Sequence, residues 1–237
     1  KRGSLLLILN GDPIKLISKL AHLIKAECIY WNENIEPYEI NRDKLITELL
    51  LKEKRKVYTF LDQLLVNPVN IKTNNDEPYK VYGPFYRKWI DIINKTNISN
   101  NNLIQIPRTA EKIVGLKERD LSPIKNSNLN YCISRESKSV YDLITSNRFT
   151  NTNLCPCKPG ESEAKNQLHF FINSGGINSY NQARDIPSLE STSNLSAALS
   201  LGTISCRAVW NGAHISKSIA TDEYQTNSID TWIKELA

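Results

Sequence analysis

Hydroxyl side chains are concentrated at Ser191, Thr192 and Ser193, directly before an apolar run from Leu195 to Leu201. The run predicts a short helix that Gly202 ends, because glycine readily adopts the left-handed conformation that stops a helix. Ser193 then lies where its side chain can cap that helix. Hydroxyl groups and unpaired amides at a helix start also favour a bound anion. The stretch is therefore interpreted either as an ordinary helix cap, which is the commoner arrangement, or as a phosphate site.

Cysteine and histidine residues do not form a recognisable metal-binding pattern. The chain has 5 cysteines, an odd count, and no secretory signal, which together favour a reducing compartment and a cytoplasmic location. Cys155 and Cys157 are separated by a single proline, with no second cysteine pair and no histidine pair nearby. Structural zinc sites require four such ligands. We therefore expect no metal, and structural or surface roles for the 3 histidines.

Composition indicates a globular protein with enough apolar residues for a core. The chain has 237 residues, of which 40% are hydrophobic, so it can form one large domain or two small ones. The net charge of +5 is compatible with a polyanionic partner without requiring one. No apolar run approaches the ~20 residues of a membrane span.

The first part of the chain predicts alternating strands and helices. Asp12 is expected to cap the first helix, and Asn41 to begin the second. The expected strands are apolar or rich in β-branched and aromatic residues, and they cover residues 5–9, 28–31 and 56–60. Such β-α-β-α-β alternation is typical of a parallel, Rossmann-like sheet wrapped by helices. The glycine-rich dinucleotide fingerprint is absent, however.

The rest of the chain has a different texture. A helix is expected around residues 86–93, followed by a polar stretch with weak periodicity. From Gly160 onward, apolar residues recur at helical spacing, with Gly175 and Gly176 ending one helix and Thr203 and Ser205 opening another. We therefore predict a partial α/β domain at residues 1–95, an interdomain linker at 96–158, and the start of an all-helical domain at 159–237.

Taken in order, short motifs along the whole chain resemble those of the DNA photolyase/cryptochrome family. The motifs of the first part read Glu36-Pro37-Tyr38 with Arg42-Asp43, Phe60-x-Asp62-x-Leu64-Leu65, and Pro78-Tyr79-Lys80-Val81-Tyr82-x-Pro84-Phe85 with Trp89. Those of the second part read Pro159-Gly160-Glu161-x-x-Ala164, Tyr180-x-x-x-Arg184-Asp185-x-Pro187, Thr192-Ser193-x-Leu195-Ser196 with Gly202, Ile204-Ser205 and Arg207, and Trp232-x-x-Glu235-Leu236. Each motif is weak alone, but their shared order and spacing make coincidence improbable.

The resemblance implies a light-driven enzyme of DNA repair. In this family, reduced FAD excited by blue light passes an electron to a cyclobutane pyrimidine dimer that has been flipped out of the duplex. Flipping is needed because the reacting bonds are buried in the base stack. Damaged DNA is thus the implied partner, FAD the implied cofactor, and a folate or deazaflavin antenna a further implied chromophore. We expect a monomer that does not bind membranes.

The resemblance also implies a role for individual residues. The implied FAD contacts are Tyr180, Thr192, Ser193, Asn194, Leu195, Ser196 and Trp232. Glu235 would face the dimer, Arg184 would contact the DNA backbone, and Glu39 would hold an antenna pterin. Without the family context, Arg184 with Asp185 reads as a surface ion pair, Trp232 as core, and Glu235 as a solvated surface residue.

Two departures from the family pattern stand inside the hydroxyl motif, and larger ones stand at the ends. Ser191 and Asn194 occupy positions where many members have glycine or arginine, although neither change removes a hydroxyl or an amide. The first strands of the family and most of its flavin domain have no counterpart here, so the sequence reads as a fragment. We expect this chain alone to bind FAD poorly and to repair nothing; stoichiometric flavin absorbance would contradict that.

The sequence is also compatible with two other functions. A cryptochrome-type flavin photoreceptor would share every motif present, with Glu235 a weak indication of repair. An α/β nucleotide-binding module of the adenine-nucleotide-hydrolase or electron-transfer-flavoprotein type would need a phosphate-binding glycine loop in the α/β part, and none is visible in the sequence.

Overall fold

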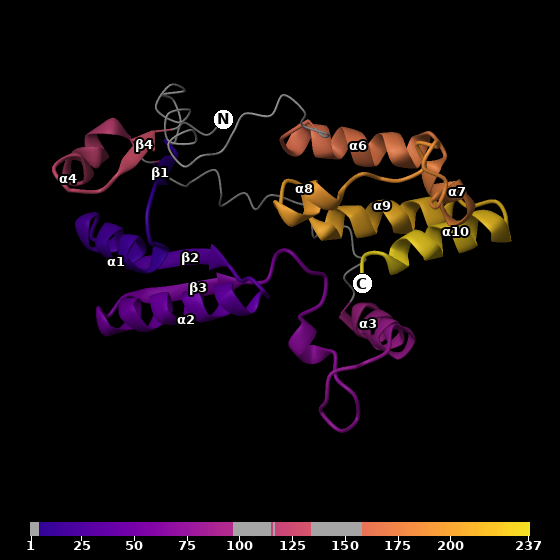
Figure 1. The fold of residues 1–237 in the computed structure, drawn as a ribbon, viewed down its shortest axis with the longest axis horizontal. Helices are drawn as coiled ribbons and strands as arrows, with labels where there is room; N and C mark the ends of the chain where they lie inside the picture. The colour runs from indigo at the N-terminus through magenta and orange to yellow at the C-terminus, as the bar shows by residue number, and fades with distance from the viewer. Residues whose placement is uncertain (1–4, 97–114, 116, 134–157) are drawn as a thin grey trace. The chain divides into compact units, whose positions relative to one another are not determined.

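The computed structural model describes residues 5–96, 115, 117–133 and 158–237 (Figure 1). These residues fall into two compact units. The first holds residues 5–60, 115 and 117–133, and the second holds residues 61–96 and 158–237. Within the described ranges, no helix combines the length and the apolarity required to cross a membrane.

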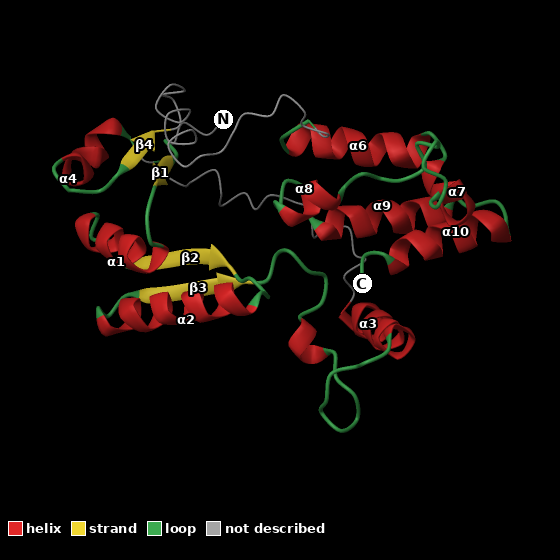
Figure 2. Cartoon of the chain, in the orientation of Figure 1, coloured by secondary structure: helices red, strands yellow, loops and turns green. Residues whose placement is uncertain are grey.

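The first unit begins with the predicted alternation of strands and helices (Figure 2). Its elements are β1 (Leu7–Leu9), α1 (Pro13–Leu23), β2 (Cys28–Asn32), α2 (Pro37–Lys52), β3 (Lys56–Phe60), the 3-10 turn η4 (Glu118–Leu121), α4 (Ser122–Lys125) and β4 (Tyr131–Ile133). Asp12 caps α1 as expected, since its carboxylate accepts a hydrogen bond from the amide of Ile14 at 3.0 Å. The second helix starts earlier than predicted, at Pro37 rather than Asn41, because proline suits the first position of a helix.

Strands β2 and β3 form the expected parallel pair, in register from Cys28 opposite Lys56 to Asn32 opposite Phe60. One face of the pair packs against buried residues of α1 and α2, among them Ala21 and Leu50. On this face the sheet contributes Ile29, Trp31 and Val57. The α/β architecture of this unit is therefore confirmed.

Strand β1 does not join that pair. It lies antiparallel to β4, with Leu7 opposite Ile133 and Leu9 opposite Tyr131. The physical reason is a second small core, in which Leu5 packs with Leu121 and Ile124. The prediction of one parallel sheet from all three early strands is therefore wrong for β1.

The predicted domain boundaries also need correction. Residues 117–133 fall within the range assigned to a linker, yet they form η4, α4 and β4 and bury Leu121, Ile124 and Leu129. The helix α3 (Tyr82–Thr96), assigned to the first domain, belongs to the second unit. The reason is the apolar face of α3, because Trp89 and Ile93 are buried in the core of the second unit. The described part of residues 96–158 is thus not simply a connection.

The second unit is helical, as predicted. After the 3-10 turn η1 (Pro68–Asn70) and α3, it contains α6 (Glu161–Asn173), α7 (Gly176–Ala183), α8 (Ser196–Ser200), α9 (Cys206–Ser218) and α10 (Glu223–Lys234). Its core is rich in aromatic residues, with Trp210 packed edge-to-face on Trp89 at 5.4 Å between ring centroids. Such pairs contribute beyond the burial of their area. The glycine stops are confirmed, because Gly175 and Gly202 both have positive φ, at 83° and 66°.

Candidate functional site

The hydroxyl loop, defined here as Ser191 to Ser196, is held at two buried points. The hydroxyl of Ser191 donates to the carbonyl oxygen of Ala183 at 2.6 Å, which ties the loop to the end of α7. Leu195 is only 2% exposed and packs into the core of the unit. Between these anchors, Thr192 is exposed and Ser193 is half-buried. The loop therefore presents hydroxyl groups towards solvent from a fixed base.

The prediction that Ser193 caps the following helix is wrong. The cap position of α8 is Leu195, and no side chain in the described part of the chain bonds to the first amides of that helix. Asn194 adopts a left-handed conformation with φ 51°, and Thr192 donates to its side-chain oxygen at 3.1 Å. This turn, with the burial of Leu195, moves the helix start beyond the reach of Ser193. The serine that caps a helix here is Ser205, which accepts from the amide of Arg207 at 3.2 Å.

A cavity of about 460 Å³ lies beside the hydroxyl loop. Asn194 and Leu195 line one side of it, and Gly160 and Glu163 from the start of α6 line another. The cavity thus lies between two of the motifs singled out in the sequence. Thr192 and Ser193 are not among its lining residues, so the cavity lies next to the end of the loop rather than its centre.

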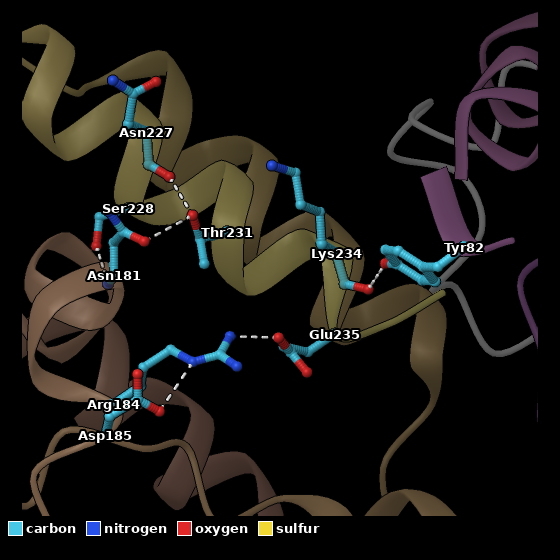
Figure 3. Close-up of polar contacts among 9 residues, drawn as sticks. All are labelled: Tyr82, Asn181, Arg184, Asp185, Asn227, Ser228, Thr231, Lys234 and Glu235. Atoms are coloured by element: carbon cyan, nitrogen blue, oxygen red, sulfur yellow. Dashed lines mark hydrogen bonds and ion pairs between the residues drawn. The ribbon is translucent and has the colours of Figure 1, made fainter. Parts of the chain in front are cut away.

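Arg184 and Glu235 meet at the ends of two helices (Figure 3). The guanidinium of Arg184 donates to a carboxylate oxygen of Glu235 and lies 3.6 Å from Asp185. It also lies 5.5 Å from the centre of the Tyr180 ring, within the range of a cation–π interaction. Hydrogen bonding and the charge of Glu235 raise the pKa of Arg184. The structure therefore brings together the predicted DNA contact and the predicted dimer contact, 51 residues apart in sequence.

Polar contacts that the sequence did not reveal hold α7 against α10 near this pair. Ser228 is 1% exposed, and its hydroxyl accepts from the amide of Asn181 at 2.9 Å. One turn further along α10, Thr231 donates to the side chain of Asn181 at 3.2 Å (Figure 3). The phenol of Tyr82 donates to the carbonyl oxygen of Lys234, beside Glu235. A serine at a core position of a helical pattern is the one signal that could have pointed to this contact.

The predicted aromatic contacts of the cofactor lie in the core. Phe171 packs against both of them, with its ring centroid 5.1 Å from that of Trp232 and 6.1 Å from that of Tyr180. Trp232 is 3% exposed and Tyr180 is 9% exposed. Burial, followed by the charge of Glu235, raises the pKa of the Tyr180 phenol. Both residues therefore stabilise the fold, which is the role that their helical spacing predicts without any cofactor.

The predicted antenna residue, Glu39, is half-buried in the first turn of α2 and belongs to the other unit. Near it in sequence, Arg42 and Asp43 form an ion pair at 2.7 Å. Among the described residues, no group of three or more histidine, cysteine or acidic side chains could hold a metal ion. Cys155 and Cys157 lie outside the described residues.

Comparison with known proteins connects these features to one family. The profile of the family described as DNA photolyase matches residues 1–101. A deoxyribodipyrimidine photo-lyase of a Synechococcus species is 33% identical over 99% of this chain, and the chain spans 45% of that relative. An uncharacterised 31.6 kDa protein of Synechococcus sp. strain PCC 6716 is 30% identical over the whole chain and is covered to 75% of its length.

The fold agrees with these sequence matches. The crystal structure of a Synechocystis cryptochrome superposes with a TM-score of 0.67 over 98% of this chain and 44% of the cryptochrome, at 16% identity. That likeness concerns the fold alone. Together with the matched profile and the sequence relatives along the whole chain, it leads to one conclusion: the chain belongs to the DNA photolyase/cryptochrome family.

Proposed function

We propose that this chain forms part of an FAD-dependent photolyase, which uses blue light to split cyclobutane pyrimidine dimers in DNA. One observation carries the proposal: Arg184 and Glu235, from different helices, form an accessible pair at one place. The guanidinium is suited to a DNA phosphate because it stays charged and offers several donors. The carboxylate beside it is suited to accept hydrogen bonds from a base that has left the stack.

The hydroxyl loop fits the phosphate groups of FAD. The hydroxyls of Ser193 and Ser196 have no hydrogen-bond partner within the described part of the chain, and Ser196 is exposed. Such hydroxyls can donate to phosphate oxygens without first breaking a protein contact, whereas Thr192 would exchange its hydrogen bond to Asn194 for one to the phosphate. The loop would not need to reorganise, because Ser191 and Leu195 fix its two ends.

The other proposed cofactor contacts have a positioning role. Tyr180 and Trp232 would form the floor of the flavin site, which Phe171 keeps rigid from behind. Asn194 and Leu195 would connect this floor to the cavity beside α6. FAD, when bound, supplies the light-driven electron; the residues of this chain hold it and orient the dimer. Glu39 would contact a folate or deazaflavin antenna.

Flavin binding is tested on the chain itself. FAD is titrated into the Ser193→Ala/Ser196→Ala variant and into a control, Ser218→Ala, which removes a hydroxyl that bonds to its own helix. We expect weak binding to the unchanged chain and the control, and still weaker binding to the double variant. Equal FAD affinity for all three proteins would show that the hydroxyl loop does not hold the cofactor.

Repair is tested on the gene product that contains this chain. Blue light should remove dimers from an irradiated oligonucleotide. Glu235→Gln should slow the repair, whereas Glu223→Gln, on the exposed first turn of α10, should leave it unchanged. A flavin-containing protein that removes no dimers under blue light would indicate the cryptochrome-type photoreceptor instead. We further propose that the protein acts as a monomer in the cytoplasm.

A further inference from the structure

A second cavity in the helical unit is lined neither by the hydroxyl loop nor by Arg184 or Glu235. It measures about 670 Å³ and is bounded by residues of α3, α9 and α10, with Asn181 from α7. Asp230 and Lys234 of α10 line the cavity, whereas Trp232 of the same helix is buried in the core. Its volume lies within the range of small-molecule sites, roughly 300–1,000 Å³. The family motifs imply no role for this cavity.

Two buried polar atoms among its lining residues have no hydrogen-bond partner within the described part of the chain. They are Nε1 of Trp210 and Nε2 of His214. Trp210 is only 2% exposed. An indole N–H can only donate, so it requires an acceptor that the described residues do not provide. A buried donor left unpaired costs about 1–3 kcal/mol, and native proteins rarely leave one without a reason.

The charges around the cavity favour an anion. Its lining contains three cationic side chains and one carboxylate. Lys217 is engaged with that carboxylate, since its ammonium lies 2.6 and 2.8 Å from the two oxygens of Asp230. Arg87 and Lys234 have no carboxylate partner within the described residues. Arg87 and Lys234 are both exposed, so two positive charges without a carboxylate partner in the described residues line the same cavity as the unpaired indole donor.

His214 adds a group that can adapt to a ligand. Its ring centroid lies 4.4 Å from that of Trp210. Burial, followed by the charge of Lys217, lowers the pKa of its imidazole, which favours the neutral ring. A neutral imidazole offers one donor and one acceptor, depending on its tautomer. It can therefore match either a hydroxyl or an oxyanion next to the indole.

We propose that this cavity binds a phosphate-bearing ligand of about mononucleotide size, with the indole N–H of Trp210 donating to the ligand and Arg87 and Lys234 neutralising its phosphate. Guanidinium and ammonium groups are the usual protein partners of phosphate. The cavity is half lined by polar groups and includes the ring of Tyr86, which suits a ligand with one charged and one aromatic end. This inference does not depend on the proposed repair activity.

The indole N–H resonances of the ¹⁵N-labelled chain provide the test. The chain has 4 tryptophans, and the Trp210 signal is assigned by its absence in Trp210→Phe, or by substitution of the other three if that variant does not fold. Adenosine monophosphate, inorganic phosphate and a short oligothymidylate are the probes. We expect the Trp210 signal to shift with saturation in the roughly millimolar range or below.

A matched pair of variants makes the result decisive. Arg87→Gln/Lys234→Gln should weaken the response about tenfold, whereas Lys95→Gln/Lys165→Gln, which removes two exposed cations outside the cavity, should not. A response to adenosine monophosphate identifies a free ligand, and one to oligothymidylate alone identifies a nucleic-acid phosphate. The proposal is overturned if no probe shifts the signal, or if the shift is the same in both double variants.

Discussion

Replacing Arg184 and Glu235 by glutamine, singly and together, measures what their ion pair contributes. The side chains are 32% and 47% exposed, so solvent screens the attraction. Pairs of this kind contribute about 0.2–1 kcal/mol. Arg184 also lies over the Tyr180 ring, an interaction that adds about 0.5–1 kcal/mol at exposed sites. Arg184→Gln should therefore lower the free energy of unfolding by about 0.5–1 kcal/mol more than Glu235→Gln does.

Urea denaturation of the four proteins checks these values through a double-mutant cycle. We expect a coupling energy below about 1 kcal/mol. A larger coupling would mean that the pair is a structural element of the fold and not an accessible site. Equal losses from the two single variants would contradict the proposed contribution of the Tyr180 ring.

The same variants separate stability from DNA binding. If Arg184 contacts a phosphate, Arg184→Gln should reduce by about one the slope of the logarithm of DNA affinity against the logarithm of salt concentration. Glu235→Gln should leave that slope unchanged, because it removes no cation. The control is Lys165→Gln, which also removes a cation paired with a carboxylate in the same unit, at 2.5 Å from Glu161. An equal change of slope in Arg184→Gln and Lys165→Gln would refute a specific role for Arg184.

Three further predictions concern packing, capping and pH. Gly176→Ala should lower the free energy of unfolding by about 1–3 kcal/mol, because the added Cβ would lie 2.8 Å from a ring carbon of Phe171. Thermal or urea denaturation measures this loss. An unchanged stability would mean that α6 and α7 can separate freely. Ser205→Ala should lower the free energy of unfolding by about 1 kcal/mol, because Ser205 caps α9. Ser193→Ala should leave it almost unchanged, because Ser193 caps no helix. Equal losses in the two variants would contradict the observed cap. Burial, followed by the charge of a neighbouring lysine, lowers the pKa of His214, so the unfolded chain binds a proton more readily than the folded one. The free energy of unfolding should therefore fall as the pH drops through about 6.5. His214→Gln should flatten this pH dependence, and an unchanged slope in that variant would refute the prediction.

Local signals in the sequence were reliable where a single residue type decides the geometry. Asp12 caps its helix, and Gly175 and Gly202 adopt left-handed conformations, as predicted. The cap of α9 by Ser205 follows the same principle. In each of these cases the deciding interaction lies within a few residues along the chain.

Partnerships between distant residues could not be predicted. An apolar strand such as β1 can pair with the free edge of any other strand, and its apolar pattern does not determine which strand that is. The pairing with β4 depends on the burial of Leu121 and Ile124, which lie in a stretch with weak periodicity. The assignment of α3 failed for a similar reason, because Trp89 packs on Trp210, 121 residues further along the chain.

The hydroxyl loop shows that prediction from sequence is limited even within a single motif. Three consecutive hydroxyl residues all suit a cap, and propensity does not choose among them. The choice depends on Leu195, which is drawn into the core, and on the left-handed turn at Asn194. Ser191 consequently anchors the loop, and Ser193 is left without a partner in the described part of the chain.

The position of Glu235 is a further argument that the pair at the ends of α7 and α10 is functional. The C-terminal end of a helix carries a partial negative charge, so a carboxylate at that position is unfavourable for the helix itself. Arg184 stands at the C-terminal end of α7, where its positive charge is favourable, and it also compensates Glu235. A lysine or arginine at residue 235 would suit α10 better. Local rules of this kind are broken most often where a site requires a particular chemical group. Here the unfavourable carboxylate is the residue proposed to face the lesion, and its compensating arginine is the residue proposed to bind the DNA.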